Sequence, residues 1–407
     1  MPEKEILNLI KPTKEEERKL KEKAKDVIEK VKIKNVKLEL GGSVAKGTWL
    51  KGNHDIDIYA KFDLKYKGHD ISSILKRKLE KFKFSTLHGS RDYFQIKKRN
   101  YVVEIVPILN IKNVAQAENI TDVSPFHVKW VRKHKELADE MRLAKAFCKA
   151  NKLYGAESYI KGFSGYVLEI LIVNYGSFRN LLKASLDWKN KEVIDVENYY
   201  KNNDAMRELN VSKTKSPLIV IDPVQKERNA AAGLSLEKFN LFKKIAKDYL
   251  NGPSVKYFLR EKLTLKKIKQ VAGNNKLIVV QAKTLQGKKD VIGAKLLKVF
   301  THLKKHLILN DFKLLDSGWE WDENVMFYFV LDKKMLSKTK KHFGPPRNSK
   351  RLNDFKQKWA GKRICYKNNF AYVVIDRKYR LPEELVKKLI KSEYVTSRVK
   401  SVNLIKL

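Results

Sequence analysis

The sequence predicts an α+β protein of several domains, and three observations support this fold class. The chain has 407 residues, enough for two to four domains at about 100 to 200 residues each. Hydrophobic residues make up 43% of the chain, enough to fill real cores. Strand-like and helical segments follow one another in blocks rather than at random. We expect a sheet-containing head over 1–135, a mainly helical neck over 136–255, and a basic α/β body and tail over 256–407.

The expected head begins with a charged helix and continues with strands. Thr13 and Glu16 have the spacing of a capping box, in which each side chain accepts a hydrogen bond from the other residue's backbone N–H. The expected strands are 36–40, 55–60, 93–97 and 101–108, and the expected basic helix is 71–82. Together they predict a small unit with a mixed or mostly antiparallel sheet.

The next stretch is expected to be mostly helical. Apolar residues recur at helical spacing in three segments, and Gly176 follows the second of them as a typical stop residue. The expected helices are 127–149, 163–175 and 236–250, and one apolar strand is expected at 218–221. Ser235 is a typical N-cap residue, and Gly252 with Pro253 is a typical end signal for the last helix.

After Pro253 the pattern changes to alternating strands and helices. The expected strands are 276–280, 325–331 and 371–375, and the expected helices are 294–307 and 382–390, the latter as the final element. The aromatic residues of 319–328 could stack on bases, but aromatic residues at strand spacing more often belong to a core. The Gly-Pro-Pro triplet at 344–346 predicts a loop.

Composition excludes several classes of protein. Aromatic residues make up 10% of the chain, more than a disordered chain would contain. No stretch approaches the ~18 consecutive apolar residues of a membrane helix, and the mixed charges of the N-terminus are unlike a signal peptide. Cys148 and Cys365 alone cannot form a disulfide framework or a zinc site. We interpret them as buried thiols in a reducing compartment, and expect a cytoplasmic protein that does not bind membranes.

The charge of the chain predicts a polyanionic partner. Lysine and arginine number 87 against 46 acidic residues, which gives a net charge of +41. Cationic side chains bind phosphates and release counterions, so nucleic acid is the leading partner. A membrane-surface protein would concentrate its charge in one helix or at one end, whereas here the charge is spread along the chain. Compositional bias toward lysine could inflate the excess.

Two aspartates and a glycine turn form the strongest candidate for chemistry. Asp55 and Asp57 are two residues apart on an expected strand, so their side chains point to the same face. Neighbouring carboxylates repel unless cations lie between them, and their oxygens suit Mg²⁺. The turn at 41–43, Gly-Gly-Ser, could offer backbone N–H groups to a phosphate. Each feature alone could be an ordinary strand face or turn, but together they favour nucleotidyl transfer at a two-metal site.

Glu104 is the candidate for a third carboxylate. It is the single acidic residue in an otherwise apolar strand-like run, 101–106. A buried carboxylate must be paired, bound to a metal or protonated, because burying an unpaired charge is costly. The alternative is an edge-strand glutamate that points to solvent.

Seven short motifs follow one another in order along the chain. They are 42–50 (GSVAKGTWL), 55–57 (DID), 104–107 (EIVP), 124–130 (SPFHVKW), 153–157 (LYGAE), 162–166 (GFSGY) and 222–229 (DPVQKERN). From about residue 36 to residue 260 the sequence therefore resembles the polymerase-beta-type nucleotidyltransferases, and most closely the archaeal (class I) CCA-adding enzymes. The remainder of the chain resembles that family mainly in length, charge and alternating elements.

The resemblance implies a role for each matching position. Asp55, Asp57 and Glu104 would be the catalytic carboxylates that bind two Mg²⁺ ions, although Glu104 replaces an expected aspartate. The positions implied to bind CTP or ATP are Gly42, Ser43, Lys46, His127, Lys145, Tyr154 and Arg228. Among them, Ser43 and Lys46 would hold the triphosphate, and Arg228 would contact the base through its planar donor group.

Taken singly, several of these residues have ordinary explanations. His127 could be a hydrogen-bonded histidine at a helix start. Lys145 could be a solvated charge on a lysine-rich helix, and Tyr154 could be a packing residue before a glycine. Arg228 could form a surface ion pair with a nearby acid such as Asp222.

The segment 333–363 is the best candidate for a tRNA-binding surface. It contains twelve basic residues and one acidic residue, Asp354. The residues expected to contact RNA are Lys333, Lys334, Lys338, Lys340, Lys341, Arg347, Lys350 and Arg351. Contacts to an RNA helix are mainly to its backbone, which suits the shared shape of tRNA acceptor stems. A solvated loop in a lysine-rich protein is the alternative.

The sequence and the resemblance together predict addition of C, C and A to the 3′ end of tRNA, with release of pyrophosphate. CTP, ATP and the tRNA acceptor end are the expected substrates, and a homodimer is conceivable. The alternatives are another enzyme of the superfamily, such as a poly(A) polymerase or an oligoadenylate synthetase, and a non-catalytic RNA-binding protein on the same scaffold.

Overall fold

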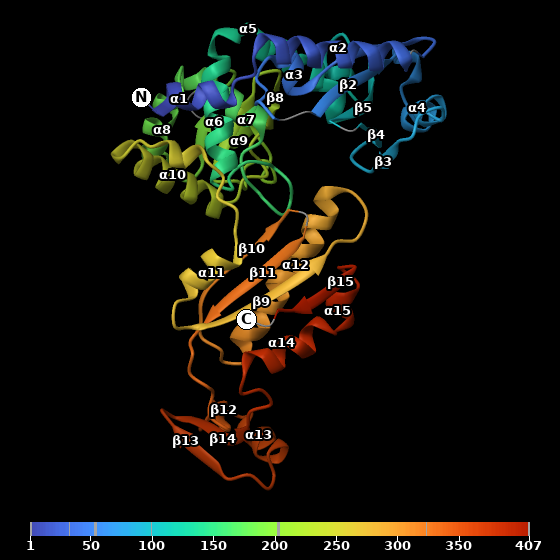
Figure 1. The fold of residues 1–407 in the computed structure, drawn as a ribbon. Helices are drawn as coiled ribbons and strands as arrows, with labels where there is room; N and C mark the ends of the chain where they lie inside the picture. The colour runs from blue at the N-terminus through green and yellow to red at the C-terminus, as the bar shows by residue number, and fades with distance from the viewer. Residues whose placement is uncertain are drawn as a thin grey trace. The chain divides into compact units, whose positions relative to one another are not determined.

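The computed structural model describes residues 2–31, 33–52, 55–98, 100–201, 204–322 and 324–405. The chain contains two compact units, 1–261 and 262–407 (Figure 1). Helices and sheets occur in both units, which confirms the expected α+β class. Within the described ranges, no helix combines the length and apolar character needed to cross a bilayer.

The first unit contains a five-stranded sheet. Its strands, in spatial order, are β1 (Val36–Leu40), β2 (Asp55–Phe62), β5 (Tyr101–Leu109), β4 (Tyr93–Lys98) and β3 (Ser85–Leu87). β2 and β5 pair in parallel, and every other neighbouring pair is antiparallel. The sheet is therefore mixed, as expected, and two of its inner strands, β2 and β5, carry all three candidate carboxylates.

One face of this sheet is buried under two helices, α2 (Lys14–Lys30) and α4 (Ile71–Lys78). Val27 and Leu75 of these helices join Ile56 and Ile58 of β2 in one apolar cluster. Because side chains alternate along a strand, Asp55 and Asp57 lie on the opposite face. The capping box of α2 is present, as expected, between Thr13 and Glu16.

The expected helix over 127–149 is wrong, because the chain forms two helices there. α5 (Ser124–Lys133) ends at His134, whose φ of −111° and ψ of 38° are not helical. A short 3₁₀ turn, Lys135–Leu137, then leads into α6 (Ala138–Ala150). On either side of this bend, Trp130 and Val131 of α5 and Leu137 pack against one apolar cluster, and this packing favours two helices over one straight helix.

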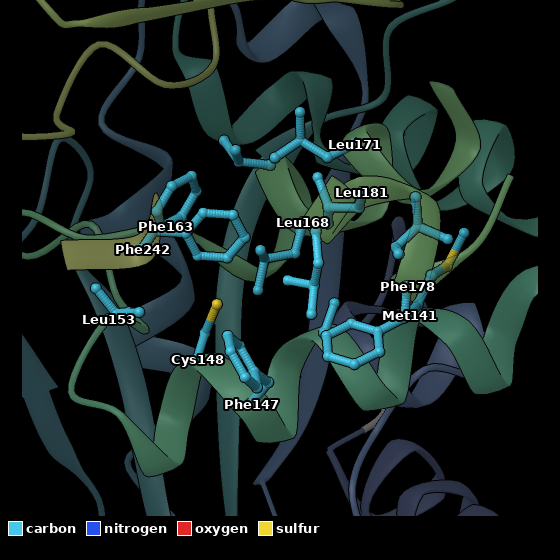
Figure 2. Close-up of a cluster of buried hydrophobic side chains, with 14 of the residues drawn as sticks. Met141, Phe147, Cys148, Leu153, Phe163, Leu168, Leu171, Phe178, Leu181 and Phe242 are labelled. Atoms are coloured by element: carbon cyan, nitrogen blue, oxygen red, sulfur yellow. The ribbon is translucent and has the colours of Figure 1, made fainter. Parts of the chain in front are cut away.

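The short helix α9 (Ala205–Glu208) packs apart from α6, in a small cluster with Ile219 and Ile221. The helices that pack around α6 are α1 (Pro2–Ile10), α7 (Gly165–Tyr175), α8 (Phe178–Asp187) and α10 (Leu236–Asn251). Figure 2 shows their core, in which Phe147 and Cys148 of α6 lie among residues such as Leu168 and Phe178. Cys148 is buried, as expected, and Cys365 is half-buried. Ser235 caps α10 and Gly176 ends α7 in the left-handed conformation, both as expected.

A small sheet and one further short helix also belong to this unit. The sheet consists of β6 (Glu192–Ile194), β7 (Leu218–Asp222) and β8 (Gln225–Asn229), in that order. The short helix α3 (Gly42–Lys46) follows β1 directly. The expected helix over 163–175 begins later, because the Ser164 side chain caps α7 and leaves Phe163 outside it.

The second unit is built on a four-stranded antiparallel sheet. Its strands, in spatial order, are β10 (Leu314–Trp321), β11 (Val325–Leu331), β9 (Lys276–Lys283) and β15 (Ser401–Leu404). Its helices are α11 (Leu265–Ala272), α12 (Lys289–Leu309), α14 (Pro382–Ile390) and α15 (Glu393–Thr396). Phe327 is fully buried, and Trp319 and Trp321 pack against the same core, which confirms the core interpretation for these three aromatic residues. Tyr328 lies outside that cluster and donates its hydroxyl to Asp316.

Two expectations for this unit are wrong. The helix over 382–390 is not the final element, since α15 and β15 follow it. The Gly-Pro-Pro triplet at 344–346 is not a loop but belongs to β12 (Thr339–Pro346). β12 is the edge strand of a second sheet, with β14 (Phe370–Asp376) and β13 (Ile364–Lys367), and α13 (Leu352–Lys358) packs on it. An edge position and a register shift after Phe343 accommodate prolines that lack an N–H donor.

Candidate active site

The pairing of β2 with β5 brings the three candidate carboxylates together. Asp57 lies directly opposite Glu104 in the parallel register, and Asp55 precedes Asp57 on the same face of β2. β5 is flanked by β2 on one side and β4 on the other. Glu104 is therefore not an edge-strand residue pointing to solvent. Its carboxylate accepts a hydrogen bond from Gln95 Nε2 at 3.1 Å.

The electrostatics of these three carboxylates favour the binding of a cation. Burial and the nearby charges of Glu104 and Asp55 raise the pKa of Asp57 to about 7. Burial also raises the pKa of Glu104. Oxygen donors that repel one another in this way fit a divalent metal ion, which would remove the repulsion. Within the described ranges, however, no three acidic, histidine or cysteine side chains stand close enough to hold one ion as they are.

Gly42 allows the chain to pass close to Asp57. Its φ is +58°, and a Cβ atom at this position would lie 1.7 Å from Asp57 Oδ2. The neighbouring Gly41 donates its N–H to the Asp57 carbonyl oxygen at 2.7 Å. A Cβ atom at Gly41 would lie 2.5 Å from the Tyr59 ring, so the start of α3 can lie against the strand that carries the acidic pair only because both residues lack a side chain.

A pocket opens beside these carboxylates. Its lining comprises Ser43, Lys46, Asp55, Asp57, Glu104, Lys145, Tyr154, Gly165, Tyr166 and Glu169. Four of the expected nucleotide-binding residues, from three separate segments of the chain, thus meet the three carboxylates at one place. Lys145 is 4% exposed, so it is not the solvated surface charge of the alternative interpretation.

Glu169 of α7 is a site residue that sequence reasoning missed. Its carboxylate is 1% exposed and binds both pocket lysines, Lys46 at 2.8 Å and Lys145 at 2.6 Å. Thr48 Oγ1 donates to it at 2.6 Å. The signal was present in the sequence, because Glu169 is the single acidic residue of an apolar run, as Glu104 is.

His127 and Arg228 do not line this pocket but belong to an adjoining cluster around Asp222. His127 Nε2 is 3.1 Å from Asp222 Oδ2, and Arg228 Nη1 donates to the same oxygen at 2.5 Å. Tyr166 donates its hydroxyl to Asp222 Oδ1 at 3.0 Å, and its ring centroid lies 4.1 Å from that of His127. Tyr166 also lines the pocket, with Lys46 Nζ 4.8 Å from its ring. Tyr166 therefore joins the two groups of residues.

Arg228 does pair with Asp222, but not at the surface. Asp222 is fully buried, while the Arg228 side chain is 31% exposed. Burial alone would raise the pKa of Asp222, but its contacts with His127 and Arg228 outweigh this and lower it to about 2. Burial lowers the pKa of His127 and so disfavours its charged form, and the guanidinium of Arg228 supplies the positive charge of the cluster at neutral pH.

Replacing Asp222 with Asn is expected to destabilise the protein by ~3 kcal/mol at pH 7, because Arg228 and His127 lose a buried charged partner. A carboxylate whose pKa falls on folding stabilises the fold above its unfolded pKa of about 4 and loses this effect as the pH falls toward about 2. The difference between variant and parent should therefore narrow as the pH falls from about 4 to about 2. Urea unfolding at several pH values measures it, and a difference that does not vary with pH would contradict the role of the charge.

The expected RNA-binding residues lie in the loop after β11 and around the β12 sheet of the second unit. All eight are exposed except Lys340, which is half-buried and pairs with Asp311 at 3.3 Å. Lys341 lies over the ring of Tyr372 at 4.7 Å, and Arg347 lies over the ring of Tyr366 at 4.4 Å. Cationic and aromatic groups thus share this surface.

Comparison with known proteins identifies the class to which this fold and site belong. A family model described as "Nucleotidyltransferase domain" matches residues 20–127. A cytoplasmic RNA terminal U-transferase covers 64% of the chain and 98% of its own length, with a TM-score of 0.50 and 14% identity. The Cid1 poly(U) polymerase has a TM-score of 0.51 at 13% identity, with the same coverage. The first unit therefore has the polymerase-beta-like nucleotidyltransferase fold.

Closer relatives identify the family. Models described as "tRNA nucleotidyltransferase, second domain" and "CCA-adding enzyme, C-terminal domain" match residues 139–259 and 274–402. A CCA-adding enzyme of Nanoarchaeum equitans is 40% identical over 75% of this chain and 76% of its own. One from Saccharolobus shibatae is 30% identical over 96% of this chain and 92% of its own. The chain belongs to the family of CCA-adding enzymes.

Proposed function

We propose that the pocket beside β2 and β5 adds C, C and A to the 3′ end of tRNA, the reaction after which the family is named, using CTP and ATP. The observation that carries this proposal is the register of Asp57 with Glu104, which gathers three carboxylates next to two lysines from other segments. Carboxylates can hold the metal ions of a nucleotidyl transfer, and lysines can bind a triphosphate.

In this proposal the terminal ribose hydroxyl of tRNA attacks the α-phosphorus of the nucleotide, the bond to the β-phosphate breaks, and pyrophosphate leaves. Asp55, Asp57 and Glu104 would hold Mg²⁺, and Glu104 would exchange its bond to Gln95 for this role. When bound, the ions would favour ionisation of the attacking hydroxyl and offset charge on the triphosphate. Glu104, as one of these ligands, would also help to deprotonate the attacking hydroxyl.

The basic residues around the pocket would bind the nucleotide. Ser43 and Lys46 lie beside the acidic pair and would contact the triphosphate, with Lys145 and Tyr154 completing the wall. Arg228 gives one N–H group to Asp222, and its exposed remaining donors would face the base. Asp222 and His127 would hold this guanidinium in place.

The reaction is tested by incubating the protein with tRNA that lacks its 3′ CCA and with one labelled nucleotide at a time. We expect CTP alone to add two residues, ATP alone to add none, and the mixture to add three and stop. Extension with ATP alone, or long tails, would instead indicate a poly(A) polymerase. No incorporation under any condition would favour a non-catalytic RNA-binding protein.

The basic surface of the second unit predicts a steep salt dependence of tRNA binding. We propose that the residues from Lys333 to Arg351 contact tRNA phosphates, each contact lowering the slope of log affinity against log salt by about 0.7 to 0.9. Replacing Lys338 and Lys341 with Gln should flatten the slope by about 1 to 2, as measured by titration over a range of KCl concentrations. Lys133 of α5, replaced in the same way, is the matched control. An affinity that barely responds to salt would contradict the phosphate contacts.

A further inference from the structure

Glu169 lies at the centre of a buried network that joins three helices. It comes from α7 and binds Lys46 of α3 through one carboxylate oxygen and Lys145 of α6 through the other. The two N–O distances are 2.8 and 2.6 Å, and neither the carboxylate nor Lys145 is more than 4% exposed. A charge so deeply buried needs partners at both oxygens, and Glu169 has them.

The charge of Glu169 also determines the charge of Lys145. Burial lowers the pKa of Lys145, and the charge of Glu169 opposes this effect. In return, the two lysines outweigh the burial of Glu169 and lower its pKa to about 2. Among the causes of the Lys145 pKa shift, the interactions with Glu169 alone favour the charged form of this lysine, and removal of the carboxylate would remove them.

The two lysines differ in how many of their N–H donors are already in use. An ammonium group has three N–H donors. Lys145 directs its donors to Glu169 Oε1, Thr48 Oγ1 at 2.8 Å and the Thr48 carbonyl oxygen at 3.3 Å. Lys46 gives one donor to Glu169 and lies over the Tyr166 ring. Lys46 therefore keeps donors that a phosphate in the pocket can use, whereas Lys145 is held by its partners.

We propose that Glu169 is a positioning residue for the triphosphate of the incoming nucleotide. It keeps Lys145 charged inside the protein and holds Lys46 against the pocket, and it acts through these lysines without touching the nucleotide itself. This inference rests on the proposed function, in which both lysines belong to the triphosphate site. Because the triphosphate is common to CTP and ATP, the effect should not distinguish the two nucleotides.

Replacing Glu169 with Gln tests the proposal, because the amide keeps the shape but not the charge. We expect equilibrium affinity for CTP, ATP and inorganic tripolyphosphate to fall by about tenfold each, measured without tRNA. The KM for both nucleotides should rise by the same factor, with a smaller change in kcat at saturating nucleotide. The matched control is Glu140→Gln on α6, whose carboxylate accepts a hydrogen bond from the Phe178 N–H away from the pocket. It should leave these affinities unchanged.

A double variant separates positioning from a purely structural role. In a Lys145→Met protein the buried ammonium is gone, so Glu169→Gln should cause a smaller further loss of tripolyphosphate affinity, namely the part that acts through Lys46. An equal loss in both backgrounds, or unchanged nucleotide affinity in the single variant, would overturn the proposal. Thermal unfolding of each variant shows whether it folds. If Glu169→Gln does not fold, Glu169→Asp replaces it; this variant keeps the charge and should lose less affinity for tripolyphosphate than Gln. Failure of the parent protein to add CCA would count against the proposed function instead.

Discussion

Replacing Asp57 with Asn is expected to lower nucleotide incorporation by about a thousandfold or more, since an amide loses the charge with which this residue would hold a metal ion between itself and its neighbours. Single-turnover addition of labelled CMP to tRNA lacking CCA measures the effect. Affinity for tRNA should stay the same, because the tRNA contacts proposed here lie in the second unit. Incorporation at the parental rate would show that the acidic group is not the catalytic site.

The same substitution should make the metal-free protein more stable at neutral pH. The pKa of Asp57 is raised on folding to about 7, so ionisation of this carboxylate opposes folding increasingly as the pH rises from about 4 to about 7. Asn carries no such charge, and Asp57→Asn should therefore unfold at higher temperature than the parent at pH 8 in the presence of a chelator. An exposed aspartate of α2, Asp26, replaced by Asn, is the control and should show neither effect.

Replacing Gly42 with Ala is expected to lower incorporation by about a hundredfold or more, because the added methyl group would overlap the Asp57 carboxylate. The overlap cannot be relieved by a rotation at Gly42, since the methyl position is fixed by a backbone φ of +58°. Either the Asp57 side chain or the start of α3 must move, and a shift of about 1 Å in a catalytic group can cost a hundredfold in rate.

Gly68 provides a matched control for the backbone strain. Its φ is +78°, so Ala is also unfavourable there, but nothing lies within 4 Å of the added Cβ. Gly68→Ala should cost ~1 kcal/mol of stability and leave incorporation unchanged. Equal losses of activity in the two variants would show that the strain, rather than the contact with Asp57, is responsible.

Local sequence signals were sufficient for most of the fold. The capping box of α2, the Ser235 cap of α10 and the alternation of β2 depend on neighbouring residues only, and each is present as expected. Errors arose where packing decides. The segment over 127–149 has helical spacing throughout but bends at His134, and the prolines at 345 and 346 enter a strand because that strand lies at a sheet edge.

The candidate site shows the same division. Asp55, Asp57 and Glu104 could be selected from the sequence because a paired acid motif and a lone acid in an apolar run are local features. Glu169 carries the second signal too, but its spacing does not reveal that its partners are lysines from two other helices. The environment of Arg228 could not be predicted in this way, because only the structure shows that its partner Asp222 is buried and also contacts His127.

The sequence by itself determined the α+β class, the acidic pair, the ordered motifs and the excess of positive charge, because these follow from local spacing and composition. Only the tertiary structure decided that Asp57 faces Glu104, that Glu169 joins the two pocket lysines, and that Tyr166 links the pocket to the Asp222 cluster. The physical reason is that strand register and helix packing bring together residues separated by tens of positions, and the burial that results sets their charges.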